Sequence, residues 1–168
     1  MSPKNPPKTD TTPAGRLVEA GLRQIVGYGI AQAAITANDV FTAKVGKPLS
    51  LRRVEYTLLM LIQENPACSA SRLARALDVT APNITMWIDK LEERGWVVRE
   101  KSQVDRRSQH LRLSPKGARL ATEATQRLIE GERAALARLS PAERAMLTEL
   151  LHKVACCRQD TGLNGPED

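Results

Sequence analysis

Aromatic side chains are scarce in this 168-residue chain, which has two tryptophans, two tyrosines and one phenylalanine. Proteins that bind single-stranded RNA or DNA usually stack the unpaired bases on aromatic side chains. The shortage therefore disfavours that class of protein. No segment approaches the roughly 20 apolar residues of a membrane-spanning helix, and the polar, proline-rich start MSPKNPPKTDTTP has no apolar core of a secretory signal.

Cysteine and histidine are also few. Three cysteines, an odd number without an export signal, favour reduced thiols in a cytoplasm over a disulfide framework. His152 and Cys156 lie four residues apart on one predicted helix, which supplies at most half of a metal site. The chain also has no glycine-rich phosphate loop and no nucleophile–base–orienter set. We therefore expect no metal, no cofactor and no enzyme activity.

The charge of the chain is distributed unevenly. The formal net charge is +6, and residues 72–116 contain ten Lys/Arg against six Asp/Glu, a difference of +4. Most of the positive excess thus lies in one segment, which favours a polyanionic partner for that segment.

Hydrophobic periodicity and capping residues predict a mainly helical chain with one β-hairpin. Thr12-Pro13 predicts the start of a long first helix, and Ser50 the start of a second. Serines at 69 or 71 open a third helix, Thr80 a fourth that ends before Gly95, and Ser114-Pro115 a fifth. Ser140-Pro-Ala-Glu143 is a capping box for the last helix. The predicted hairpin strands are residues 96–99 and 110–113.

The fourth helix has an apolar face and an opposite face suited to a DNA groove. Ile84, Trp87, Ile88 and Leu91 form the apolar face. On the other face Asn83 can bond an adenine edge, and Ala81 or Met86 can touch thymine methyls. The candidate DNA-contacting residues of this helix are Thr80, Ala81, Pro82, Asn83, Thr85, Met86 and, for a phosphate, Lys90. The alternative is an ordinary solvated helix face.

The turn of the hairpin carries Arg106 and Arg107. The negative potential of an A/T-rich minor groove attracts arginine, although a solvated charged turn has the same composition. Asp105 would repel a phosphate, so we expect it to orient an arginine or cap the turn. Further candidate contacts to the DNA backbone are Arg72, Arg75 and Arg112.

Three segments in this order resemble the MarR family of bacterial transcriptional regulators. They are the second-helix opening LRRVEYTLL at 51–59, the recognition helix VTAPNITMWIDKLEERG at 79–95, and the wing signature DRR at 105–107 with LRLSPKG at 111–117. The resemblance covers roughly residues 14–157 and implies a cytoplasmic homodimer with intertwined terminal helices, bound to operator DNA. The chain departs from the family in having apolar residues at Ala81 and Met86.

The resemblance also implies a small-molecule effector, often an aromatic carboxylate or a phenolic compound, near the junction of the dimer helices and the DNA-binding lobe. The candidate residues for such a pocket are Tyr28, Arg53, Tyr56 and Met60. Some members of the family respond to oxidants, which makes Cys68, Cys156 and Cys157 alternative sensing residues. Cys68 precedes a predicted helix, whose dipole can lower the pKa of a thiol.

Together these observations predict a winged helix-turn-helix DNA-binding lobe at 48–117, with helical dimerisation regions at 12–47 and 118–158. Residues 1–11 and 159–168 are expected to be disordered. The predicted function is that of a ligand-released repressor at a pseudo-palindromic operator. The alternatives are a winged-helix protein-interaction module that does not bind DNA, and a thiol-based redox sensor of the same family.

Overall fold

Helices make up most of the computed structural model, which describes residues 11–101 and 109–160. In chain order they are α1 (Val26–Phe41), the π-helical turn η2 (Thr42–Gly46), α2 (Lys47–Leu49), α3 (Arg53–Glu64), α4 (Ala70–Leu77), α5 (Ala81–Glu93), α6 (Pro115–Ala135) and α7 (Pro141–Asp160). Strands β1 (Val97–Lys101) and β2 (Gln109–Leu113) pair antiparallel, with Arg99 opposite Leu111. The predicted fold class, mainly helical with a small hairpin, is confirmed.

One hydrophobic core joins α3, α4, α5 and the hairpin, which we call the winged lobe (residues 51–113). Apolar residues at helical spacing on α3 and α5 point inward, and alternate residues of the strands do the same. The fully buried side chains of this lobe include Leu51, Leu58, Leu59, Ile62, Ile84, Ile88, Leu91, Val97 and Leu111. The start of α6 closes the core with Ala121 and Ala124.

Serine caps start three helices as the sequence predicts. Ser69 accepts the backbone N–H of Arg72 before α4, and Ser114 accepts that of Gly117 at 3.0 Å before α6. Ser140 and Glu143 exchange bonds before α7, with the Ser140 N–H donating to the Glu143 carboxylate at 2.7 Å. Each bond satisfies an N–H that lacks a partner within its helix.

Two predicted helix starts are wrong. The first helix begins at Val26 rather than at Thr12-Pro13, because the chain turns at Gly15 and Arg16, both with positive φ, and the Thr12 hydroxyl accepts the Leu17 N–H. Ser50 does not cap α3, since it lies in the left-handed region at φ 48°. The N-cap position belongs to Arg52, whose N–H donates to Glu55 at 2.8 Å.

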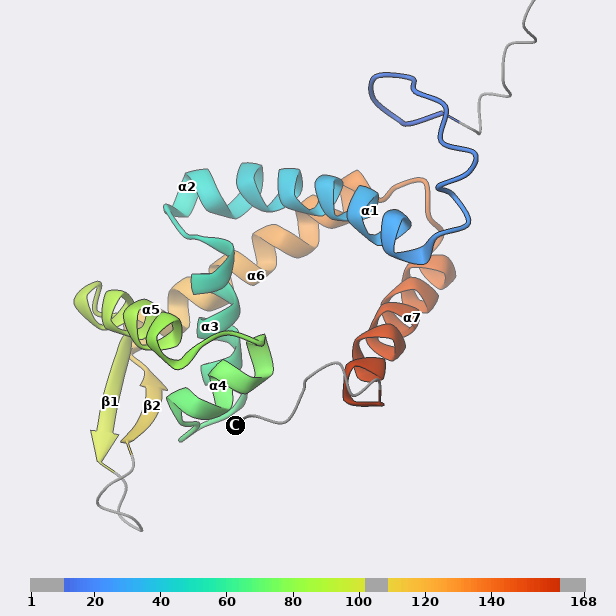
Figure 1. The fold of residues 1–168 in the computed structure, drawn as a ribbon. Coiled ribbons are helices and arrows are strands. Elements are labelled where there is room, and N and C mark those ends of the chain that lie inside the picture. The colour runs from blue at the N-terminus through green and yellow to red at the C-terminus, as the bar shows by residue number, and fades with distance from the viewer. Residues whose placement is uncertain (1–10, 102–108, 161–168) are drawn as a thin grey trace, which may run out of the picture.

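Most of the length of the terminal helices α1 and α7 lies outside the winged lobe, and each touches it at one end. Figure 1 shows α1 running beside α6, and α7 turning back from the far end of that pair. Near its C-terminus α7 approaches α4, where Arg158 donates to the carbonyl of Ala76 at 3.3 Å. The helix extends to Asp160, two residues beyond its predicted end. Most of the predicted arm at 1–11 and tail at 159–168 lies outside the described residues.

Apolar side chains on the terminal helices and in the segment before α1 remain exposed. On the N-terminal side they are Leu17, Val18, Leu22, Ile25, Val26, Ile30 and Ile35, and on α7 they are Met146, Leu147, Leu150, Leu151 and Val154. None of the described helices is both long enough and apolar enough to cross a membrane.

Candidate nucleic-acid interface

Helices α4 and α5 form a helix-turn-helix, with a turn at Asp78 in the left-handed conformation (φ 54°). The Val79 N–H donates to the Ala74 carbonyl and ties the turn to α4. On α5, Ile84, Ile88 and Leu91 are buried in the lobe core. This burial fixes the rotation of α5 about its axis, so that the opposite side of the helix faces solvent.

The solvent side of α5 contains the residues that the sequence predicts for DNA contact. Thr80 holds the N-cap position, and the exposed residues that follow are Ala81, Pro82, Asn83, Thr85 and Met86, with Lys90 half-buried. A shallow groove runs along this side from Ala81 to Glu93. The structure therefore brings these candidates together on one accessible helix surface.

Ion pairs between α5 and the hairpin were not foreseen from the sequence. Arg99 on β1 pairs with Asp89 and with Glu92 at 3.2 Å, so one guanidinium bridges two carboxylates of the recognition helix. Arg112 on β2 pairs with Glu100 at 3.3 Å, and both side chains are about half exposed. Arg112 must therefore exchange or share this partner if it is to contact a phosphate.

The remaining basic candidates lie on α4 and in the wing. Arg72 and Arg75 are exposed on α4, the helix that precedes the recognition helix. Asp105, Arg106 and Arg107 lie outside the described residues. Strand β1, which precedes that segment in the chain, contacts α5 through Arg99.

A junction around Arg94 holds the end of α5 in place. The Arg94 guanidinium donates to the carbonyl of Ser50 at 2.9 Å, pairs with buried Glu55 at 3.3 Å and lies 3.6 Å from the centroid of the Trp96 ring. Lys116 of α6 donates to the Arg94 carbonyl. Four segments thus meet at the C-terminal end of the recognition helix, a role that the sequence alone did not indicate for Arg94.

The cysteines differ in burial, since Cys68 is buried and Cys156 and Cys157 are exposed. Burial raises the pKa of the Cys68 thiol, outweighing the nearby Arg72 guanidinium, so the predicted lowering by the helix dipole is wrong. Cys156 and Cys157 are exposed on α7, and the Cys156 sulfur lies 3.7 Å from His152 Nε2. Among residues 11–101 and 109–160, no group of three or more His, Cys, Asp or Glu side chains is arranged to hold a metal ion.

Three of the four candidate effector residues lie together. Tyr56 and Thr125 hydrogen-bond through their hydroxyls at 3.0 Å, and the Thr125 hydroxyl donates to the Met60 sulfur. Arg53 lies on the same helix as Tyr56, over the Phe41 ring, and donates to the carbonyl of Ala37. Tyr28 lies nine residues before Ala37 on α1, about 13 Å along the axis. It donates instead to Glu19, which raises the pKa of its phenol.

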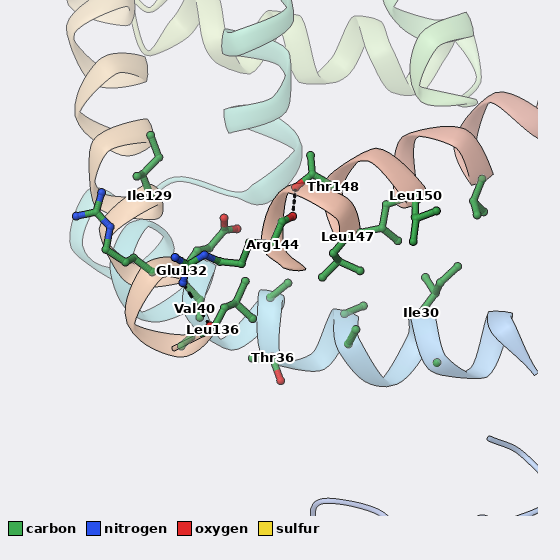
Figure 2. Close-up of a pocket in the computed structure, with 18 of the residues that line it drawn as sticks. Ile30, Thr36, Val40, Ile129, Glu132, Leu136, Arg144, Leu147, Thr148 and Leu150 are labelled. Atoms are coloured by element: carbon green, nitrogen blue, oxygen red, sulfur yellow. Dashed lines mark hydrogen bonds between the residues drawn. The ribbon is translucent and has the colours of Figure 1, made fainter. Parts of the chain in front are cut away.

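A larger hollow of about 900 Å³ opens between α1, α6 and α7. Figure 2 shows Ile30 of α1 facing Leu147 and Leu150 of α7 across it, with Val40 of α1 beside Leu136 at the other end of the hollow. Its lining is mostly apolar, and none of the four predicted effector residues belongs to it. This hollow includes many of the apolar side chains that the terminal helices leave exposed.

Comparison with known proteins shows which family has this architecture. Residues 51–109 match the family model of the MarR family. Over 145 residues the chain is 32% identical to a Thauera aromatica protein described as a transcriptional regulatory protein for the hcr operon, with 86% of each protein covered.

The chain belongs to the MarR family. A similar solved structure is that of the transcriptional repressor CouR bound to a 23-mer DNA duplex, with TM-score 0.75 and 28% identity, covering 83% of this chain and 98% of that one. The transcriptional regulator BldR from Sulfolobus solfataricus aligns with TM-score 0.69 and 27% identity, covering 83% and 99%. These MarR-family relatives are regulators of transcription rather than enzymes, and the lobe that they share with this chain is a winged helix.

Proposed function

We propose that the chain is a homodimeric repressor that binds a pseudo-palindromic operator in duplex DNA and is released by a small molecule. The observation that carries this proposal is the accessible side of α5, held by a buried core in a fold similar to that of a repressor bound to a DNA duplex. In a helix-turn-helix the second helix enters the major groove and the first crosses the backbone. Arg72 and Arg75 on α4 suit that backbone contact.

The exposed apolar residues of the terminal helices support a dimer. Large exposed apolar patches on a soluble protein mark an interaction surface, and here they line both sides of the hollow between α1, α6 and α7. A second copy of the chain that inserts its own terminal helices would cover Ile30, Leu147 and Leu150. Such a dimer presents two α5 helices, which must lie about 34 Å apart to enter successive major grooves.

Release by an effector follows from that spacing requirement. A ligand that binds better to a dimer with the wrong separation lowers DNA affinity by its preference for that state. Arg53, Tyr56 and Met60 lie where α3 meets α1 and α6, between the dimer helices and the winged lobe. A cationic group beside aromatic rings suits a flat aromatic carboxylate, and salicylate and benzoate are suitable first probes in a binding titration.

The function is tested by measuring the affinity of the protein for the duplex upstream of its own gene, with nonspecific competitor, at several salt concentrations. Replacing both Arg106 and Arg107 with alanine should lower the affinity for the duplex and reduce the dependence of that affinity on salt concentration, because fewer counterions are released. A matched control replaces Arg127 and Arg138, which lie on α6 and in the turn after it, and should leave the salt slope unchanged. Equal slopes for all three proteins would remove the wing from the interface.

A protein-interaction module without DNA binding is the second candidate. The apolar residues Ala81 and Met86 on the exposed side of α5 favour it, because they remove polar groups that can contact DNA. If the upstream duplex does not bind, a random duplex pool selected on the protein distinguishes an unknown operator from the absence of DNA binding. Failure to enrich any duplex would favour the interaction module.

A further inference from the structure

The N-terminal half of α5 exposes a surface that is largely apolar. Ala81, Pro82, Thr85 and Met86 line one side of the shallow groove, and Met86 is 44% exposed. The Thr85 hydroxyl donates to the Ala81 carbonyl at 3.0 Å. Because its hydroxyl hydrogen is used within the helix, Thr85 has no hydroxyl donor left for a base and offers its methyl group and an acceptor oxygen. We call these four residues the apolar α5 face.

Asp89, the acidic residue of the groove nearest to this face, is paired from within the lobe, whereas Glu93 lies at the other end of the groove. Asp89 forms an ion pair with Arg99, which also pairs with Glu92 at 3.2 Å. A free carboxylate on a recognition helix repels phosphates and accepts hydrogen bonds from cytosine. The positive charge of the Arg99 guanidinium offsets the charge of the Asp89 and Glu92 carboxylates and reduces their repulsion of DNA phosphates. The apolar residues therefore dominate the contact surface of this part of the helix.

Thymine is the base whose major-groove edge carries an apolar group, the C5 methyl. Guanine and the N7 of adenine require hydrogen-bond donors, and the side chains of Ala81, Pro82 and Met86 offer none. We propose that the apolar α5 face recognises thymine methyl groups in the major groove, with Met86 and the methyl of Thr85 as specificity-determining contacts. This inference rests on the proposed function and names the bases that the recognition helix selects.

The first test removes the methyl groups from the DNA. A duplex enriched from a random pool is resynthesised with single thymine-to-deoxyuridine replacements, which delete the methyl and leave base pairing intact. At the contacted positions, binding should weaken about three- to fivefold for each methyl removed. Failure to enrich any duplex overturns the proposed function. An enriched duplex that tolerates every replacement overturns this inference alone.

The second test changes the protein by matched pairs. Thr85→Val keeps the methyl and should bind like the wild type, whereas Thr85→Ser keeps the hydroxyl and should bind severalfold more weakly. Met86→Leu should retain affinity, and Met86→Ala should lose both affinity and sensitivity to deoxyuridine at one position in each half-site. Both positions are on the exposed side of α5, so thermal unfolding should change little.

The combination of the two tests identifies the contact. A duplex that is sensitive to deoxyuridine at one position with the wild type, and insensitive there with Met86→Ala, supports the assignment of Met86. If Met86→Ala keeps the full sensitivity at every position, the methyl groups are read by other residues and the role of Met86 is overturned. If Thr85→Ser binds more tightly than Thr85→Val, the hydroxyl rather than the methyl of Thr85 makes the contact.

Discussion

The winged lobe and the terminal helices differ in how far their apolar residues are buried. In the lobe, Leu58, Leu59 and Ile88 are completely buried by neighbours from the same chain. On α1 and α7, Ile35 and Leu150 are more than half exposed. The same residue types thus form a closed core at one end of the molecule and an open surface at the other.

This difference indicates how the two regions are stabilised. Burial of an apolar side chain contributes roughly 1.5–3 kcal/mol, and the lobe obtains it within one chain. The exposed apolar residues of the terminal helices obtain it only when another surface covers them. We therefore expect the stability of the lobe to be independent of protein concentration and the packing of α1 and α7 to depend on it.

The largest expected effect is a steric conflict between α6 and the winged lobe. A Cβ on Gly117 would lie 2.0 Å from the Trp96 carbonyl oxygen, so that Gly117→Ala should lower the free energy of unfolding by about 3 kcal/mol or more. The matched control is Gly27→Ala on α1, where a Cβ meets nothing within 4 Å. It should be neutral or slightly stabilising, as expected for alanine in a helix. Chemical denaturation of both variants provides the comparison, and equal effects would contradict the close packing of α6 on Trp96.

The next effect concerns the open surface. Leu150→Asp places a charge on the face that the proposed dimer buries, and should weaken self-association roughly a hundredfold, because an unpaired buried charge is strongly unfavourable. The control is Lys153→Asp, which puts the same residue at a position outside the hollow, where Lys153 pairs with Glu149. Sedimentation at several concentrations measures the change. Unaltered association of Leu150→Asp would show that α7 does not form the dimer interface.

A smaller loss of stability is expected from the junction around Arg94. Arg94→Ala removes the partner of buried Glu55 and the stacking on Trp96, and should cost about 2 kcal/mol of unfolding free energy. Arg94 also donates to the Ser50 carbonyl and thereby fixes the C-terminal end of α5. We therefore expect operator binding to weaken more than the loss of folded protein alone explains. Arg138→Ala, an exposed change in the turn after α6, is the control. If the two arginine variants unfold alike, the junction contributes little.

The smallest effect is a pH dependence at the start of α7. The pKa of Glu143 is lowered because its carboxylate accepts the Ser140 N–H, with the Ser140 side chain also contributing. A lowered pKa in the folded state stabilises the protein above the ordinary value of 4.5, and this contribution is lost as the pH falls through the lowered value. Thermal unfolding of wild type and Glu143→Gln should therefore differ at neutral pH and converge under acid conditions. A pH-independent difference would contradict the carboxylate cap.

Local signals in the sequence predicted much of the fold. Ser114-Pro115 and Ser140 with Glu143 marked helix starts because a cap acts within four residues of chain. The spacing of Ile84, Ile88 and Leu91 predicted which side of α5 is buried, and the structure confirms it. The helix start at Thr12 was wrong because the turn at Gly15 and the Thr12–Leu17 bond compete with the helical cap.

Contacts between distant residues could not be predicted in this way. Neither the bridge from Arg99 to Asp89 nor the pairing of Arg94 with Glu55 follows a local spacing rule, and both depend on how the hairpin and α3 pack against α5. The pKa of Cys68 was misjudged for the same reason, since its burial comes from the pairing of Cys68 with Leu111 of β2. The individual DNA contacts remain predictions.

Repression by a dimer on duplex DNA is tested most sharply by the affinity and stoichiometry of the protein on a duplex selected from a random pool, measured by fluorescence anisotropy with heparin as competitor. We expect two chains to bind each duplex, with half-sites about one helical turn apart and with binding that weakens steeply as salt increases. Binding of a single chain, or no duplex that outcompetes heparin, would contradict it.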